Sequence, residues 1–160
     1  MAIGTDAAIQ FFGTQDEVTV ASPGAVANGA LSAAGDVSDW TNDDDAPLAM
    51  FVLVLQDLSG AATAGDTIDL YCKPLDVVNT SGDHQGPTST LKTIYLGSFA
   101  VDSVDPAATD DNYVLGPVAL PNTKTSQIYE FYIFNNLTTV GIDAADWELW
   151  ITPLTYGPHG

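Results

Sequence analysis

The chain has 160 residues, of which 46% are apolar, and its 21 acidic and 3 basic residues give a formal net charge of −18. The apolar content supports a folded core and argues against wholesale disorder, since a chain of this size can bury roughly 70% of its unfolded surface. The negative field repels phosphate groups, which excludes nucleic acids and anionic membrane surfaces from the expected partners.

Most of the acids are Asp, and Glu occurs only at positions 17, 130 and 148. Because Asp favours turns and Glu favours helices, this composition predicts a loop-rich β protein with acidic loops. The single Cys72 cannot form an internal disulfide. The first residues lack the features of a signal peptide, and the longest apolar run, 46–55, is too short to span a bilayer. We therefore expect the protein to be made and folded in a cytoplasm.

Short apolar segments separated by Gly, Pro, Asn and Asp predict eight strands. In chain order they are Ala7–Phe12, Glu17–Val20, Leu48–Leu55, Thr67–Pro74, Leu91–Phe99, Asn112–Leu120, Gln127–Asn135 and Trp147–Leu154. No segment has a convincing helical stripe. The pattern predicts an all-β fold, a single two-sheet antiparallel β-sandwich with jelly-roll topology. It forms one domain over residues 1–160, in which residues 1–28 are a candidate N-terminal arm.

Alternation along the strands predicts which side chains face the core. The inward sets are Ile68, Leu70 and Cys72 in the fourth strand, and Trp147, Leu149 and Ile151 in the last. Trp150 then points outward. The segment Leu48–Leu55 is continuously apolar, which is typical of a strand covered on both faces.

The segment Gln127–Asn135 is apolar and aromatic on both of its faces. One face carries Ile128, Tyr132 and Phe134, and the other carries Tyr129, Phe131 and Ile133. In a sandwich only one face can enter the core, so the other is either a protein interface or lies under a covering segment. The loop Ser22–Thr41 and the N-terminal arm are the two candidates for that cover. The interface candidates are Tyr129, Phe131, Ile133, Tyr132 and Trp150.

Trp150 also suggests a second class of function. Jelly-roll lectins stack sugar rings on exposed aromatic side chains, and Trp150 is the best placed of the three Trp residues to act as such a platform. An outward aromatic side chain can equally anchor a protein interface, so both readings are open.

Residues that could carry catalysis are few. His84 and His159 lie in a loop and near the chain end, without the spacing of metal ligands, and Cys72 faces the core. Glu130 and Glu148 both lie on predicted strands, and a carboxylate pair on a β-sandwich is the arrangement that many glycosidases use. Only proximity in space would support that pair. We therefore expect neither enzyme activity nor a cofactor.

The acidic turn after Trp40 offers clustered oxygen ligands. Asp43, Asp44 and Asp45 could contribute to a Ca²⁺ site, which takes six to eight oxygens. Their spacing is not that of an EF-hand, and no Glu closes the loop. A solvated turn before a buried strand is the favoured interpretation, and Ca²⁺ is the alternative.

Five blocks of the sequence, taken in their order, resemble virion proteins of tailed bacteriophages. They are "SDWTNDDDAPLAMFVLVLQ", "TAGDTIDLYCKPL", "YLGSFAVD", "LPNTKTSQIYEFYIFNN" and "WELWITPLTYGP", spread over residues 28–158. The resemblance implies a small structural component, a jelly-roll decoration (cement) protein on the outer surface of the capsid. It carries no catalytic motif, and it leaves a tail or fibre position open.

The resemblance also implies partners and a location. The partners would be the major capsid protein and further copies of this chain, as a dimer or trimer, on the virion surface after synthesis in the host cytoplasm. The strong negative charge suits an outer surface and argues against lining a DNA-filled interior. The alternative function is a glycan-binding module of a phage tail or fibre that uses exposed aromatic side chains.

Overall fold

The structure is a computed structural model that describes residues 8–77, 86–88, 90, 94–101, 110–122 and 124–158. This part of the chain contains nine strands and no helix. The strands are β1 (Ala8–Phe12), β2 (Asp16–Glu17), β3 (Trp40–Asn42), β4 (Leu48–Leu55), β5 (Thr67–Pro74), β6 (Tyr95–Ala100), β7 (Asp111–Ala119), β8 (Gln127–Asn135) and β9 (Trp147–Pro158).

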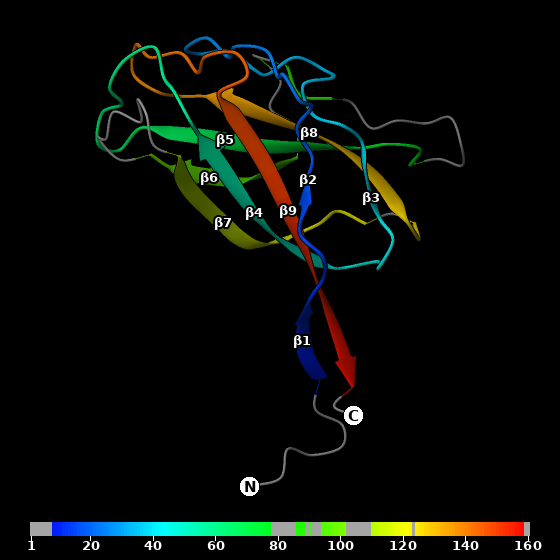
Figure 1. Cartoon of the computed structure of the whole chain (residues 1–160). Coiled ribbons are helices and arrows are strands. Elements are labelled where there is room, and N and C mark those ends of the chain that lie inside the picture. Colours follow the sequence, from blue (N-terminus) through cyan, green and yellow to red (C-terminus); the bar gives the residue numbers. More distant parts are fainter. Residues whose placement is uncertain are drawn as a thin grey trace, which may run out of the picture.

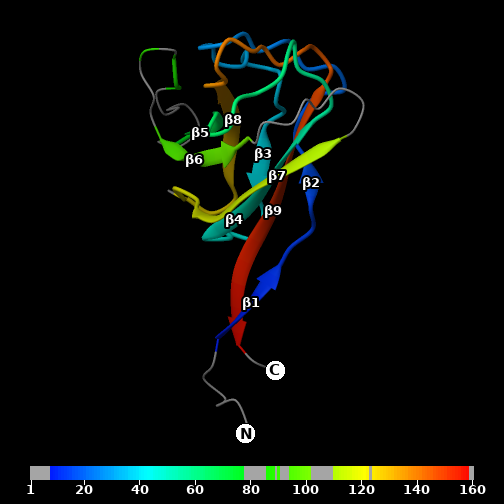
Figure 2. The ribbon, with the colours of Figure 1, turned by 90° about the vertical axis from the view of Figure 1, so that its left-hand side faces the viewer.

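The strands form two sheets that pack face to face (Figures 1 and 2). One sheet has five strands in the order β1-β9-β4-β7, with β2 also paired to β9, and the other has four in the order β3-β8-β5-β6. Each of these pairings is antiparallel. The predicted all-β, two-sheet antiparallel sandwich is therefore confirmed.

The pairings are nested along the chain. β5 pairs with β6, β4 with β7, β3 with β8, and β2 with β9. Nested antiparallel pairs of this kind arise when one long hairpin wraps around itself, and they place successive outer pairs in alternating sheets. The order is compatible with the predicted jelly roll.

The core lies between the sheets, and strand alternation decides which side chains enter it. The predicted inward side chains of β5 and β9 are confirmed, because all six are 0% exposed: Ile68, Leu70, Cys72, Trp147, Leu149 and Ile151. The sheets meet where the rings of Phe51 and Phe131 pack edge to face, with centroids 5.2 Å apart. Edge-to-face pairs of this kind add about 0.5–1.5 kcal/mol beyond the burial of area.

The prediction that Leu48–Leu55 is covered on both faces is wrong for much of β4. Ala49, Phe51 and Leu53 are 0% exposed, whereas Met50 and Val52 on the opposite face remain partly exposed. β4 is apolar throughout because it is a central strand between β9 and β7. In the part of the chain that the structure describes, no second layer covers its outer face.

Both faces of β8 are buried within the chain. On the inner face, Tyr129, Phe131 and Ile133 are at most 1% exposed, and on the outer face Tyr132 and Phe134 are 7% and 6% exposed. A separate small cluster buries the outer pair; its members are Tyr71, Tyr132, Phe134 and Leu31.

The cover of this outer cluster comes from the predicted loop Ser22–Thr41. Its backbone runs along the free edge of β8, where Ser32 N donates to the Ile133 carbonyl at 2.9 Å and Asn135 N donates to the Ala30 carbonyl at 3.0 Å. Within the described part of the N-terminal segment, β1 does not supply this cover, because it pairs with the end of β9.

The side chain of Asn135 holds the loops at one end of the sandwich. Its amide donates to the carbonyls of Val26 and Val140, both at 2.9 Å, and its carbonyl accepts from Leu137 N at 2.8 Å. Asn135 is 0% exposed, so each of these bonds satisfies a polar group that has no access to water.

Candidate functional site

The structure places three of the interface candidates in the core. Tyr129, Phe131 and Ile133 lie between the sheets, where Tyr129 and Phe131 stack with ring centroids 5.9 Å apart. Burial raises the pKa of the Tyr129 hydroxyl. These side chains have no exposed surface for a partner, so their role in this fold is to pack the core.

Tyr132 lies on the outer face of β8 but is also largely covered. It is 7% exposed and packs with Phe134 and Tyr71. Burial is the main cause that raises the pKa of the Tyr132 hydroxyl, and a hydrogen bond with Glu130 adds to it. The expected alternative of an aromatic face under a covering segment therefore accounts for Tyr132.

The exposed apolar surface lies elsewhere. The large apolar side chains with most exposure in the described residues are Phe11 at 47%, Phe12 at 69%, Tyr95 at 54%, Val114 at 61% and Tyr156 at 56%. Three of these five, Phe11, Phe12 and Tyr156, come from β1 and the end of β9. We call these two segments, Ala8–Phe12 and Thr155–Pro158, the terminal ribbon.

The terminal ribbon projects from one end of the sandwich (Figures 1 and 2). Its register runs from Phe12 opposite Leu154 to Ala8 opposite Pro158. β4 begins at Leu48, opposite Leu154, so among the described residues β9 beyond that point pairs with β1 alone. A two-stranded ribbon has two free edges and is at best marginally stable in water.

Local contacts give the terminal ribbon its shape. A Cβ on Gly157 would come within 2.8 Å of the Phe11 ring, so the ring lies over the glycine backbone. At the base of the ribbon, Gly13 N donates to the Pro153 carbonyl at 2.8 Å. The stretches "AIQFFG" (8–13) and "PLTYGP" (153–158) contain no charged residue, although the whole chain carries −18.

Sequence reasoning did not identify the terminal ribbon. It predicted a strand at Ala7–Phe12, but it ended the last strand at Leu154, whereas β9 continues to Pro158. The available signal was the adjacent pair Phe11-Phe12 and the absence of charge in both stretches.

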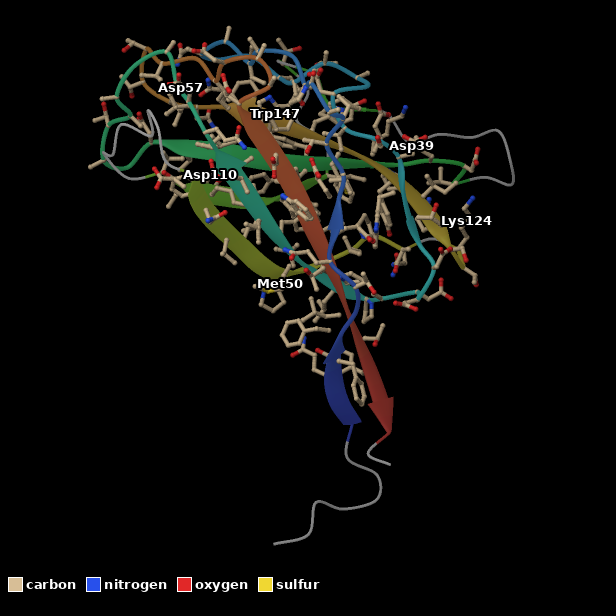
Figure 3. The ribbon with its side chains drawn as sticks, in the orientation of Figure 1. Asp39, Met50, Asp57, Asp110, Lys124 and Trp147 are labelled. Atoms are coloured by element: carbon tan, nitrogen blue, oxygen red, sulfur yellow. The ribbon has the colours of Figure 1, made fainter. Side chains whose placement is uncertain are left out.

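Trp150 does face outward, as predicted, and it borders a shallow cleft on the outer face of the five-stranded sheet. The cleft has a volume of about 300 Å³, and we call it the Trp150 cleft; its lining residues are Gln15, Val52, Val54, Asp110, Asn112, Glu148 and Trp150. The partners across the strands explain this grouping, because Val52 pairs with Trp150 and Val54 pairs with Glu148. Asp110 lies beside the start of β7 (Figure 3).

Glu130 and Glu148 do not form a carboxylate pair. Glu130 is on the outer face of the four-stranded sheet, where its carboxylate lies 3.1 Å from Lys73 Nζ. Glu148 is on the outer face of the other sheet, next to Trp150. Packed sheets are about 10 Å apart and both carboxylates point outward, so their separation exceeds the roughly 5–9.5 Å of glycosidase pairs. The geometry overturns that hypothesis.

The acidic turn is organised by amide side chains. Asn42 accepts from Ala46 N at 2.9 Å and also donates to the Ala46 carbonyl at 2.9 Å. Asp43, Asp44 and Asp45 are exposed, and Asp45 accepts from the backbone N–H of Ser126 at 2.7 Å. No group of three or more His, Cys, Asp or Glu is arranged to hold a metal ion within the described ranges.

Of the remaining candidates, only Cys72 lies within the described residues. Cys72 is 0% exposed, and burial raises the pKa of its thiol to about 12. His84 and His159 lie outside the described residues.

No helix of the described chain is long and apolar enough to cross a membrane. In comparisons with known proteins, no protein-family model matches this sequence and no curated protein matches it.

Proposed function

We propose that this chain is a structural protein of a tailed-bacteriophage virion, a decoration protein that attaches to the outer surface of the capsid shell and stabilises it. The observation that carries this proposal is the terminal ribbon, which is apolar, uncharged and projects from a strongly acidic sandwich. Exposed apolar surface of this kind is costly in water and marks an attachment site. The resemblance to phage virion proteins supplies the identity of the partner, the major capsid protein.

The distribution of charge supports attachment through the terminal ribbon. The nearest acidic residues along the chain to the uncharged stretch 8–13 are Asp6 and Asp16. In space, a carboxylate oxygen of Asp44 would lie 3.4 Å from a Cβ on Gly13, at the base of the ribbon. A protein surface that receives the ribbon beyond that base meets an uncharged stretch of chain, while the acidic sandwich stays in solvent. The repulsion between neighbouring copies on a crowded shell is also smallest when the sandwiches are held apart.

The energetics indicate that one ribbon is not sufficient. Phe11, Phe12 and Tyr156 are roughly half exposed, so burying the rest of each contributes about 1 kcal/mol, or about 3–4 kcal/mol together. Micromolar affinity needs about 8 kcal/mol. Several ribbons acting together overcome this shortfall, because linked sites bind with a high effective concentration. We therefore propose that the chain attaches as a dimer or trimer.

Co-sedimentation with particles that lack this chain tests the attachment surface. The variant replaces Phe11, Phe12 and Tyr156 by Ser, and the matched control is Val114→Ser, an equally exposed apolar residue outside the ribbon. We expect wild type and the control to sediment with the particles, and the ribbon variant to remain in the supernatant while its circular dichroism is unchanged. Binding of the ribbon variant at the wild-type level would refute this role of the ribbon.

The oligomeric state tests the second part of the proposal. Sedimentation equilibrium of the purified chain is expected to give the mass of a dimer or trimer. A protein that stays monomeric and still binds particles tightly would show that linked ribbons are not needed.

A further inference from the structure

The Trp150 cleft lies on a different part of the molecule from the terminal ribbon and has a distinct chemistry. Its lining combines three apolar side chains, Val52, Val54 and the indole of Trp150, with the amides of Gln15 and Asn112 and the carboxylates of Glu148 and Asp110. Val54 lies between Asn112 and Glu148 in the sheet, so apolar and polar groups alternate across the cleft. An aromatic ring beside several hydrogen-bonding groups suits a polar ligand that has one apolar face.

Glu148 is held in a fixed orientation within this cleft. Its Oε2 accepts from Trp150 Nε1 at 2.9 Å, and its Oε1 accepts from Gln56 Nε2 at 3.3 Å. A carboxylate has about four acceptor positions, so Glu148 retains capacity for a ligand that donates hydrogen bonds. The hydrogen bond from Trp150 Nε1 to Glu148 also holds the indole ring in a fixed position.

The donors and acceptors of the polar lining groups restrict the class of ligand. Carboxylates only accept hydrogen bonds, whereas the amide groups of Gln15 and Asn112 both donate and accept. Sugar hydroxyls also donate and accept, and the C–H face of a sugar ring can lie on an indole. A guanidinium only donates, so it would leave the amide donors unused, and an anionic sugar would be repelled by Glu148 and Asp110.

We propose that the Trp150 cleft binds a neutral sugar residue of a polysaccharide, with the ring on Trp150 and a hydroxyl donating to Glu148. The cleft is about 300 Å³, the lower end of the usual size of ligand sites, which suits one or two sugar rings. The inference does not depend on the proposed capsid attachment, because the two surfaces share no residue.

Intrinsic fluorescence is a direct reporter for this site. Trp40 and Trp147 are 8% and 0% exposed, whereas Trp150 is partly exposed, so a ligand in the cleft changes the emission of Trp150 first. The full-length protein is titrated with neutral gluco-, manno- and galacto-oligosaccharides, with an oligogalacturonate as the anionic probe and with arginine amide as the cationic probe. We expect a saturable change with at least one neutral oligosaccharide, at a Kd of about 1 mM or below.

Two variants and two controls localise the effect. Trp150→Ala removes the platform, and Glu148→Gln keeps the size of the side chain but removes its charge. Asp43→Asn removes one exposed charge elsewhere, and Tyr95→Ala removes one exposed aromatic side chain from the other sheet. We expect at least a tenfold loss of affinity in Trp150→Ala, a several-fold loss in Glu148→Gln, and no change in the controls.

Three results would overturn the proposal. The first is the absence of a saturable change with every neutral oligosaccharide. The second is equal binding of the anionic oligogalacturonate, since the carboxylates would then have no influence. The third is saturable binding of arginine amide alone, which would make the cleft a guanidinium site. Because Glu148→Gln is a conservative change at a partly exposed position, it keeps the test valid even if Trp150→Ala does not fold.

Discussion

Truncating Phe131 should be one of the most damaging single changes in this fold. Phe131 is 1% exposed, and its ring lies 5.2 Å from that of Phe51, 5.9 Å from that of Tyr129 and 6.4 Å from that of Trp40. Phe131→Ala removes contacts that join the two sheets and leaves a cavity. We expect the free energy of unfolding to fall by about 3–5 kcal/mol.

The matched change is Phe12→Ala in the terminal ribbon. Phe12 is 69% exposed, so its loss should alter the free energy of unfolding by less than about 0.5 kcal/mol. Urea denaturation followed by Trp fluorescence measures both variants. With an m-value of about 2 kcal/mol/M, Phe131→Ala shifts the midpoint by about 2 M and Phe12→Ala leaves it unchanged. Equal losses in the two variants would refute this division between the buried core and the exposed ribbon.

Three further predictions concern buried polar and ionisable groups. The backbone N–H of Thr138 and, second, that of Thr63 donate to the Asp66 carboxylate and lower its pKa below 3.8. The stabilisation by the ionised carboxylate is therefore present above about pH 4 and is lost as the pH falls through the lower pKa of the folded state. The difference in unfolding free energy between wild type and Asp66→Asn should therefore shrink from pH 7 to pH 3 in urea titrations. Cys72, with its pKa raised to about 12, should not react with a thiol reagent at pH 8 until urea unfolds the chain, and early labelling would contradict its burial. Asn135→Ala removes the side-chain partner of three buried backbone groups, of which the Val26 carbonyl keeps its bond from Ile142 N, and should cost about 3 kcal/mol by chemical denaturation. The exposed Asn136→Ala should cost less than about 1 kcal/mol.

The central strands could be predicted from the sequence because their apolar pattern is strong. The bounds of β4, β5 and β8 coincide with the predicted segments Leu48–Leu55, Thr67–Pro74 and Gln127–Asn135. These strands pair on both sides, so nearly every residue in them carries a packing constraint. The outward direction of Trp150 followed from the same alternation.

The short and terminal elements could not be predicted in this way. β3 is only three residues long, Trp40–Asn42. It is defined by its pairing with β8 and by the hydrogen bond from Asn42 to Asn122, which are both long-range contacts. The end of β9 contains Gly157 and Pro158, which are residues typical of turns, and it remains extended because β1 pairs with it.

The terminal ribbon was missed for a related reason. Hydrophobicity left two interpretations open for the second face of β8, an interface or a covering segment. The structure shows the cover, because Leu31, from a loop rich in small residues, packs on that outer face. Alternation tells which side chains share a face; it does not tell which segment covers that face. Phe11 and Phe12 are exposed because their strand extends beyond the sandwich, a property of the assembled sheet.

The most direct test of the central claim is the copy number of this chain in purified phage particles that encode it, measured by quantitative mass spectrometry against the major coat protein. A decoration protein attached through its terminal ribbon is expected at hundreds of copies per particle, in a fixed ratio to the coat protein. A handful of copies would place the chain on the tail or a fibre and contradict the capsid role. Its absence from the particles would contradict the virion assignment altogether.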